Sequence, residues 1–230
     1  MEKNMTDNRT IANLCATDLA SLLCARICHD LLSPVSALGT ALDVLDDEGA
    51  ADMRDEALEL IRASSAQASS KLEFARLAFG AGTSAPGEIA TRELKRLVDG
   101  MFVNAKATIN WRVVAPSLSK PASRLLLNLV MLAVEAAPRG GEITVEAASA
   151  ARIRVNATGD RANLFPTTAD ALEGFEPADG FDGRSIQPFY TGLMARELGG
   201  RAEARAMGES IEFVALTRVE PANTLHANAV

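Results

Sequence analysis

The sequence predicts an α + (α+β) fold: a helical hairpin that dimerises into a four-helix bundle, followed by an α/β sandwich domain. Two observations lead to this prediction. Residues 15–80 show long runs of helical apolar spacing, and residues 89–219 mix helical patterns with alternating strand patterns. The chain has 230 residues, of which 48% are apolar and 23% charged, so it is large enough for two cores of ordinary globular composition.

The composition argues against several classes of partner. The formal net charge is −7 and no block of Lys and Arg stands out, so we expect no nucleic-acid partner. No stretch approaches roughly eighteen apolar residues without a charge, so we expect no membrane span. The polar start of the chain is not typical of a secretory signal and favours the cytoplasm. Three cysteines, an odd number, indicate reduced thiols.

The first predicted element is a long helix. Residues 1–14 are expected to be a disordered leader, and the helix follows from about Asp18 to Asp46. Its apolar positions recur at alternating spacings of four and three, as in a helix with one buried face. These inner positions are Leu23, Ile27, Leu31, Pro34, Leu38, Ala41 and Leu45.

A turn over residues 46–52, which contains a glycine, leads to a second helix. Asp52 is a candidate N-cap, and the helix is expected to end at Gly80. Its inner positions are Met53, Ala57, Leu60, Ile61, Ser64, Ala68, Leu72, Ala75 and Phe79. A lone hairpin would leave both flanks of this apolar stripe in water, so we expect a homodimer in which a second copy covers them.

The second half of the chain mixes element types. Residues 81–88 are expected to be a flexible linker, residues 159–183 an irregular polar segment, and residues 220–230 a disordered tail. Ser119 is a candidate N-cap. The expected helices span 91–105, 119–137 and 184–200, and the expected strands 108–114, 142–148, 152–158, 201–206 and 211–219. This mixture predicts one sheet covered on one face by helices.

His29 is the most informative residue of the first helix. It lies two residues after Ile27, about 200° around the helix, so it is expected to point away from the bundle core. Pro34 follows on the same helix, where it removes a backbone donor at a cost of about 3 kcal/mol and leaves the carbonyl of Asp30 without its partner. A helix rule broken beside an exposed imidazole indicates a functional site, and the alternative is an incidental surface histidine.

The stretch "CHDLLSPVSAL" resembles the phospho-acceptor box of bacterial two-component histidine kinases. His29, Asp30, Leu31, Ser33 and Pro34 match that box, whereas Leu32 stands where the kinases usually carry a basic residue. The resemblance implies that His29 is the phosphoryl acceptor. The acidic residue after it, Asp30, is then expected to assist proton removal from the ring.

The second half resembles the GHKL-type ATP-binding sandwich of those kinases, in a degenerate form. Asn128 matches the first Asn of the family's Asn-x-x-x-Asn-Ala, but Leu132 replaces the second, which holds Mg²⁺ and phosphate. Asn156 and Thr158 stand for the Asp and first Gly of Asp-x-Gly-x-Gly, and only Gly192 remains of the later glycine loop. Because adenine needs a carboxylate and phosphates need a glycine cradle and a metal, we expect no useful ATP binding.

A kinase-like dimer with an acceptor histidine and a damaged ATP domain resembles the ChpT-type histidine phosphotransferases of alphaproteobacteria. This resemblance implies a relay of phosphoryl groups between receiver-domain aspartates of a hybrid histidine kinase and of response regulators. The Nε2 atom of His29 would attack the aspartyl phosphate. The receiver would bring Mg²⁺, so no cofactor of the chain's own is expected.

The helical wheel suggests which residues surround His29. Arg26 and Ser33 share its face and are expected to neighbour the phosphate, the first by charge and the second by a hydrogen bond. The receiver is expected to dock on the face that runs from His29 towards the turn. Its candidate contacts are Leu32, Ser36, Ala37, Thr40, Arg62, Ala66 and Ser69.

Other interpretations remain open at this point. The chain could be an active ATP-dependent histidine kinase or a non-catalytic dimeric scaffold of kinase shape. Cys24, Cys28 and His29 supply metal-binding atom types, but a fourth ligand is missing and the last two diverge on the helix, so we expect no metal site. The thiols are instead expected to be buried in the bundle.

Overall fold

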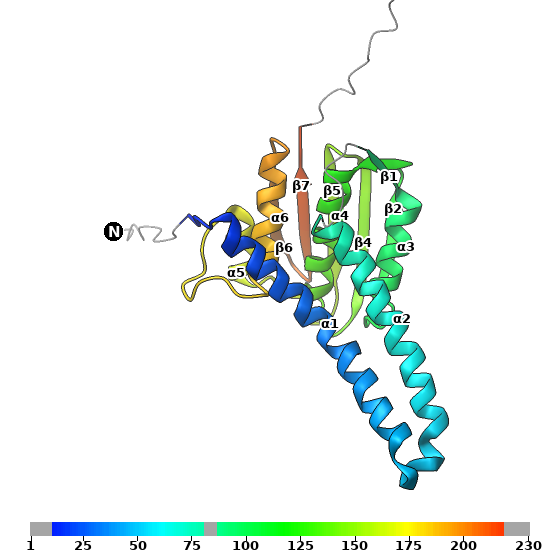
Figure 1. Cartoon of the computed structure of the whole chain (residues 1–230). Helices are drawn as coiled ribbons and strands as arrows, with labels where there is room; N and C mark the ends of the chain where they lie inside the picture. The colour runs from blue at the N-terminus through cyan, green and yellow to red at the C-terminus, as the bar shows by residue number, and fades with distance from the viewer. Residues whose placement is uncertain (1–10, 81–86, 219–230) are drawn as a thin grey trace, which may run out of the picture.

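The structure, a computed structural model, describes residues 11–80 and 87–218, which form a long helical hairpin joined to an α/β sandwich (Figure 1). The hairpin consists of α1 (Ala16–Asp46), the 3₁₀ turn η1 (Glu48–Met53) and α2 (Arg54–Ala78). Both predicted helical arms are therefore confirmed. The predicted Asp52 cap is wrong: Asp47 accepts a hydrogen bond from the Gly49 amide at 2.8 Å and starts η1, which includes residue 52.

The apolar spacing predicts the inner face of the hairpin well near its closed end. Pro34 and Ala41 on α1 and Ala57 and Ser64 on α2 are buried, as predicted. The hairpin still carries more large apolar side chains than its two arms cover, and three of the predicted inner positions of the second helix, Met53, Leu60 and Leu72, are among them. The exposed ones are Leu32, Val35, Leu42, Met53, Leu60 and Leu72.

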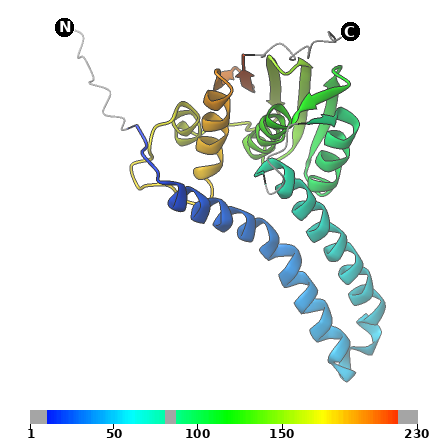
Figure 2. The ribbon, with the colours of Figure 1, turned by 45° about the horizontal axis from the view of Figure 1, so that its top comes forward.

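The two arms separate towards the sandwich, which lies between their open ends (Figures 1 and 2). On one side, Leu19 and Leu22 of α1 pack against a small apolar cluster that contains Ile186 and Phe189. On the other side, Phe74 of α2 is fully buried in the main core, where its ring meets that of Phe102 edge-on at 5.8 Å between centroids. Each arm thus belongs to two packing units, the hairpin and the sandwich.

The sheet has the strand order β2-β4-β5-β7-β6. The β2–β4 pair is parallel and the other neighbours are antiparallel. Val145, Val155 and Phe213 lie side by side across the three central strands, and all three are fully buried. The strands are β2 (Ala107–Val113), β4 (Gly141–Ser149), β5 (Arg152–Thr158), β6 (Arg201–Met207) and β7 (Ser210–Leu216).

Helices cover one face of this sheet, as predicted. The helices α3 (Thr91–Met101), α4 (Lys120–Ala136), α5 (Pro166–Glu173) and α6 (Ile186–Glu197) contact the strands, with α4 against the central ones (Figure 1). Ser119 accepts a hydrogen bond from the Ala122 amide and caps α4. The opposite face carries polar residues such as Glu146 and Arg154, which pair at 2.8 Å. None of the helices in the described ranges is long and apolar enough to span a bilayer.

Four short segments depart from the prediction. The pair β1 (Glu88–Ala90) and β3 (Ser117–Ser119) adds a small second sheet, so Glu88 belongs to a strand rather than to the linker. Helix α5 lies within the stretch that was expected to be irregular. Residues 11–14 are not a free leader, because the Ala12 amide donates to the Gly174 carbonyl at 2.9 Å. The rest of the predicted leader, most of the linker and the tail with His226 lie outside the described residues.

Candidate functional site

His29 lies on the outer surface of α1, and its side chain is 68% exposed. Its Nδ1 atom is 3.5 Å from Oδ1 of Asp30. Adjacent residues diverge by about 100° on a helix, but the Asp30 carboxylate still comes this close to the ring. The carboxylate therefore lies beside Nδ1, which leaves Nε2 as the ring nitrogen turned from Asp30.

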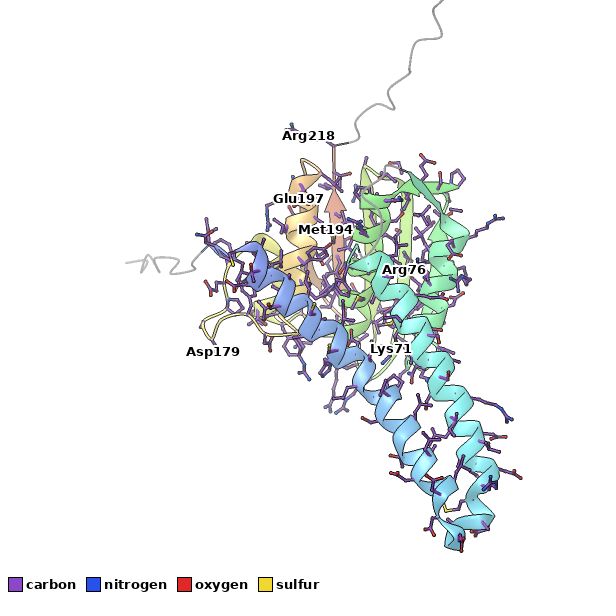
Figure 3. All side chains as sticks on the ribbon, in the orientation of Figure 1. Lys71, Arg76, Asp179, Met194, Glu197 and Arg218 are labelled. Atoms are coloured by element: carbon purple, nitrogen blue, oxygen red, sulfur yellow. The ribbon has the colours of Figure 1, made fainter. Side chains whose placement is uncertain are left out.

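The backbone carbonyl of Asp30, left without a partner by Pro34, is satisfied from the other arm. Nζ of Lys71 on α2 donates to this carbonyl at 2.7 Å. Figure 3 labels Lys71 on α2, at the level where the two arms begin to separate. A charged donor replaces the missing backbone N–H, so the helix continues through the proline without an orphaned acceptor.

Arg26 is buried rather than available on the His29 face, so its expected exposure is wrong. Only 6% of the residue is exposed, its Nε donates to Oδ2 of Asp30 at 3.0 Å, and an Nη atom donates to Glu135 on α4. Burial alone would lower the pKa of Arg26, but the charges and hydrogen bonds of Glu135 and Asp30 outweigh it and raise that pKa. The guanidinium is therefore a fixed cation that joins α1 to the sandwich.

A cleft of about 670 Å³ opens between α1, α4 and the loop that connects α5 to α6. His29, Asp30, Leu132 and Glu135 line it together, so the exposed histidine of α1 and one side of α4 face the same cavity. Asp179 lies in the loop, which Figure 3 shows beside the first half of α1.

The loop of this cleft is held by its own hydrogen bonds. Oδ1 of Asp182 accepts from the amides of Arg184 and Ser185 and from the Ser185 hydroxyl. The bonds from Ser185, followed by that from Arg184, hold the pKa of Asp182 below its ordinary value, so the carboxylate stays charged at neutral pH and keeps the turn closed.

The remaining asparagine of the kinase motif is used for packing. Asn128 is fully buried, and its Nδ2 donates to the Ala78 carbonyl at the end of α2 and to the Arg124 carbonyl, both at 2.9 Å. Its Oδ1 accepts from Nε2 of Gln187 at 3.0 Å. With these bonds, the Asn128 side chain caps the C-terminal end of α2, and its amide group is not available to bind a ligand.

The strand register corrects the placement of the adenine motif. Asn156 lies on the polar face of the sheet, whereas α4 covers the other face, where Ala157 is fully buried. A carboxylate beside α4 would therefore stand at position 157, which carries only a methyl group. In that register Gly159 matches the first glycine and Arg161 replaces the second, keeping a glycine-like φ of 65°.

Gly192, the remnant of the later glycine loop, has a packing role. A Cβ at this position would lie 2.0 Å from the Leu172 carbonyl oxygen, so any side chain would force α5 and α6 apart. The residues present thus do not fit a nucleotide: the carboxylate and the metal-binding amide are replaced by Ala157 and Leu132, and the retained Asn128 and Gly192 hold the fold together.

The residues predicted to form the docking face lie on α1 and α2. Most of its residues are exposed and Ala37 is half-buried, while the Thr40 hydroxyl donates to the Ser36 carbonyl at 3.2 Å. Ser33, the other predicted phosphate neighbour, is also exposed. The exposed members are Leu32, Ser36, Thr40, Arg62, Ala66 and Ser69.

The cysteines do not pack the bundle as expected. Cys15, Cys24 and Cys28 are all exposed free thiols. Within residues 11–80 and 87–218, no group of three or more His, Cys, Asp and Glu side chains is arranged to hold a metal ion.

Comparison with known proteins decides the family. A model of the histidine phosphotransferase C-terminal domain matches residues 91–210, more than half of the chain. Protein phosphotransferase ChpT of Brucella abortus (strain 2308) is 37% identical over 205 residues, which cover 88% of this chain and 97% of that protein. This chain belongs to the ChpT-type histidine phosphotransferases.

A solved structure agrees with this assignment. A bacterial phosphotransferase of known structure has 33% sequence identity to this chain and superposes on it with a TM-score of 0.79. The match covers 89% of this chain and 99% of that one. The transferase function and the predicted fold, a helical hairpin followed by an α/β sandwich, are thus shown. Sequence reasoning missed Lys71 and Glu135, because both act on His29's neighbours from elements remote in the chain.

The bond from Lys71 can be measured with a double-mutant cycle. Lys71→Met removes the donor to the Asp30 carbonyl and is expected to lower the free energy of unfolding by about 1–2 kcal/mol. Pro34→Ala restores a backbone N–H for the same carbonyl, so Lys71→Met should cost about 1 kcal/mol less in that background. Urea unfolding followed by circular dichroism measures all four proteins, and strictly additive effects would contradict the assigned bond.

Proposed function

We propose that this phosphotransferase relays phosphoryl groups between the receiver-domain aspartates of a hybrid histidine kinase and of response regulators, through His29. The observation that carries the proposal is an exposed imidazole with a carboxylate beside Nδ1, on a helix face with small residues. Assignment to the ChpT-type family supports the same role.

The chemistry is a nucleophilic displacement in two directions. Nε2 of His29 attacks the phosphorus of the aspartyl phosphate, the N–P bond forms as the acyl P–O bond breaks, and the aspartate leaves as a carboxylate. Asp30 stabilises the positive charge that develops on the ring through Nδ1–H. Transfer to a second receiver aspartate reverses the step and regenerates the neutral imidazole.

Positioning is the main contribution of the phosphotransferase in this proposal. The receiver supplies Mg²⁺ and the charge that offsets the phosphoryl oxygens, so the chain needs no cofactor of its own. The docking surface is the hairpin face that runs from His29 towards η1, with Ser33 near the phosphate. Arg26 is bonded to Asp30 and Glu135, so its guanidinium is not free to neighbour the phosphate as the sequence predicts.

The transfer reaction can be tested directly. Incubation with a receiver domain carrying labelled aspartyl phosphate should label the wild type but not His29→Ala, and Asp30→Asn should slow labelling about 10-fold or more. His29 is exposed and asparagine has nearly the shape of aspartate, so circular dichroism should show an unchanged fold in both variants. No label on the wild type would favour the alternative of a non-catalytic scaffold, and equal label on His29→Ala would reject a relay through His29.

We also propose that the sandwich does not bind ATP. Leu132 and Ala157 stand where the metal-binding amide and the adenine-binding carboxylate are required, and Asn128 is bonded to Ala78 and Gln187. An apolar side chain against a metal triphosphate is strongly unfavourable, because it removes ligands without supplying any.

Nucleotide binding separates this proposal from the kinase alternative. Titration with a fluorescent ATP analogue and Mg²⁺ should give no saturable signal below millimolar concentration, whereas an active histidine kinase measured in parallel should saturate. Leu132→Asn alone should not restore binding, because Ala157 still lacks the carboxylate. Saturable binding by the wild type together with autophosphorylation of His29 would establish the kinase instead.

The working unit in this proposal is a homodimer whose second hairpin covers the exposed apolar side chains of α1 and α2. Val35 and Leu42 are 53% and 52% exposed, and they extend an apolar stripe along α1 beside the face that packs on α2. Burying such a stripe in a four-helix bundle removes apolar surface from water, and the fold of each chain can stay as it is.

The oligomeric state can be changed by substitution within this stripe. The wild type should have twice the chain mass of 24.3 kDa by light scattering. Val35→Glu combined with Leu42→Glu should give a folded monomer, since neither side chain is buried within one chain. Val103→Glu, at a side chain of the sandwich that is 66% exposed, is the matched control and should remain dimeric. A monomeric wild type would refute the proposal.

A further inference from the structure

A chain of charged contacts leads from the sandwich to the acceptor histidine. Glu135 on α4 bonds Arg26 on α1, Nε of Arg26 donates to Oδ2 of Asp30, and the other oxygen of Asp30 lies 3.5 Å from Nδ1 of His29. The two oxygens of one carboxylate are thus divided between the guanidinium and the imidazole. The orientation of the carboxylate depends on where the guanidinium is held.

The position of Arg26 is set from outside its own helix. Gly183 lies near the backbone of Arg26, since a Cβ on that glycine would be in ordinary contact, 3.8 Å, with the Arg26 Cα and amide nitrogen. Only 8% of the Arg26 side chain is exposed, so the guanidinium has little freedom to choose other partners. Its planar fork can serve two carboxylates at once, which a lysine ammonium on a flexible stem does less well.

Glu135 is in an unusual place for an acidic residue. It lies in the last turn of α4, which ends at Ala136, where the helix dipole favours cations and disfavours a carboxylate. Arg26 compensates the charge there. The residue also lines the cleft next to Leu132, which stands where the kinases carry a metal ligand.

We propose that Glu135 is a positioning residue for phosphotransfer, which acts through Arg26 to hold the Asp30 carboxylate beside Nδ1 of His29. The inference rests on the proposed function of His29 and adds to it a role for the domain that has lost its nucleotide site. With the carboxylate held there, the proton stays on Nδ1 and the lone pair of Nε2 is free to attack. Glu135 and Arg26 form and break no covalent bond in this proposal.

The first measurement is the tautomer of His29, which does not depend on any receiver. The ¹⁵N chemical shifts of the ring report which nitrogen carries the proton in the unphosphorylated full-length protein. The wild type should show mainly Nδ1–H, and Glu135→Gln and Arg26→Lys should shift the population towards Nε2–H. Glu146→Gln, which removes a carboxylate bonded to Arg154 on the open face of the sheet, should leave the spectrum unchanged.

The second measurement is the rate of transfer from a phosphorylated receiver in a single turnover. Glu135→Gln and Arg26→Lys should lower the limiting rate roughly 10-fold, as loss of an outer partner does at other sites, while the receiver concentration at half-saturation stays the same. Glu146→Gln should transfer at the wild-type rate.

The outcomes separate the two proposals. Wild-type tautomer and wild-type rate in folded Glu135→Gln and Arg26→Lys would overturn the positioning role while leaving the function of His29 intact. A fall in melting temperature without a tautomer change would also overturn it, since it would reduce the contact to a structural one. Absence of transfer by the wild type would instead reject the relay, and the tautomer series would still decide the positioning role.

Discussion

The arrangement of this phosphotransferase depends on how one backbone carbonyl is satisfied. Pro34 removes the N–H that would bond the Asp30 carbonyl, and Nζ of Lys71 supplies a donor from the opposite arm. The arms can therefore separate above this point without leaving a buried acceptor unpaired. Their separation makes room for the sandwich between the open ends, and this places His29 at the edge of a cleft shared with α4.

The residues of the sandwich that match the kinase motifs have structural roles in this chain. Asn128 caps the end of α2 and accepts a hydrogen bond from Gln187. In the described part of the chain, Oε1 of Gln187 is one of two buried side-chain nitrogen or oxygen atoms that have no hydrogen-bond partner. Gly192 permits the close crossing of α5 and α6. Both residues would be retained under selection for folding alone, so their presence does not indicate nucleotide chemistry.

Apolar spacing is sufficient to predict both hairpin arms and the main helices and strands, because these elements bury one face with a regular period. It fails for α5 and for the β1–β3 pair, which are too short to show a period. The helical wheel fails at Arg26, because a wheel contains only neighbours on one helix, and the partner Glu135 lies 109 residues away. The predicted position of the adenine motif is wrong by one residue. Alternate residues of a strand face opposite sides of the sheet, and the sequence alone does not show which side is buried.

The burial of Phe74 and Ala78 in the core of the sandwich has a consequence for modularity. In many signalling proteins a phosphoacceptor hairpin can be recombined with different neighbours through a linker. Here the last two turns of α2 are an integral part of the neighbour's interior, so a cut after residue 80 would divide one folding unit. The hairpin and the sandwich therefore form one structural block rather than two modules that could be exchanged separately.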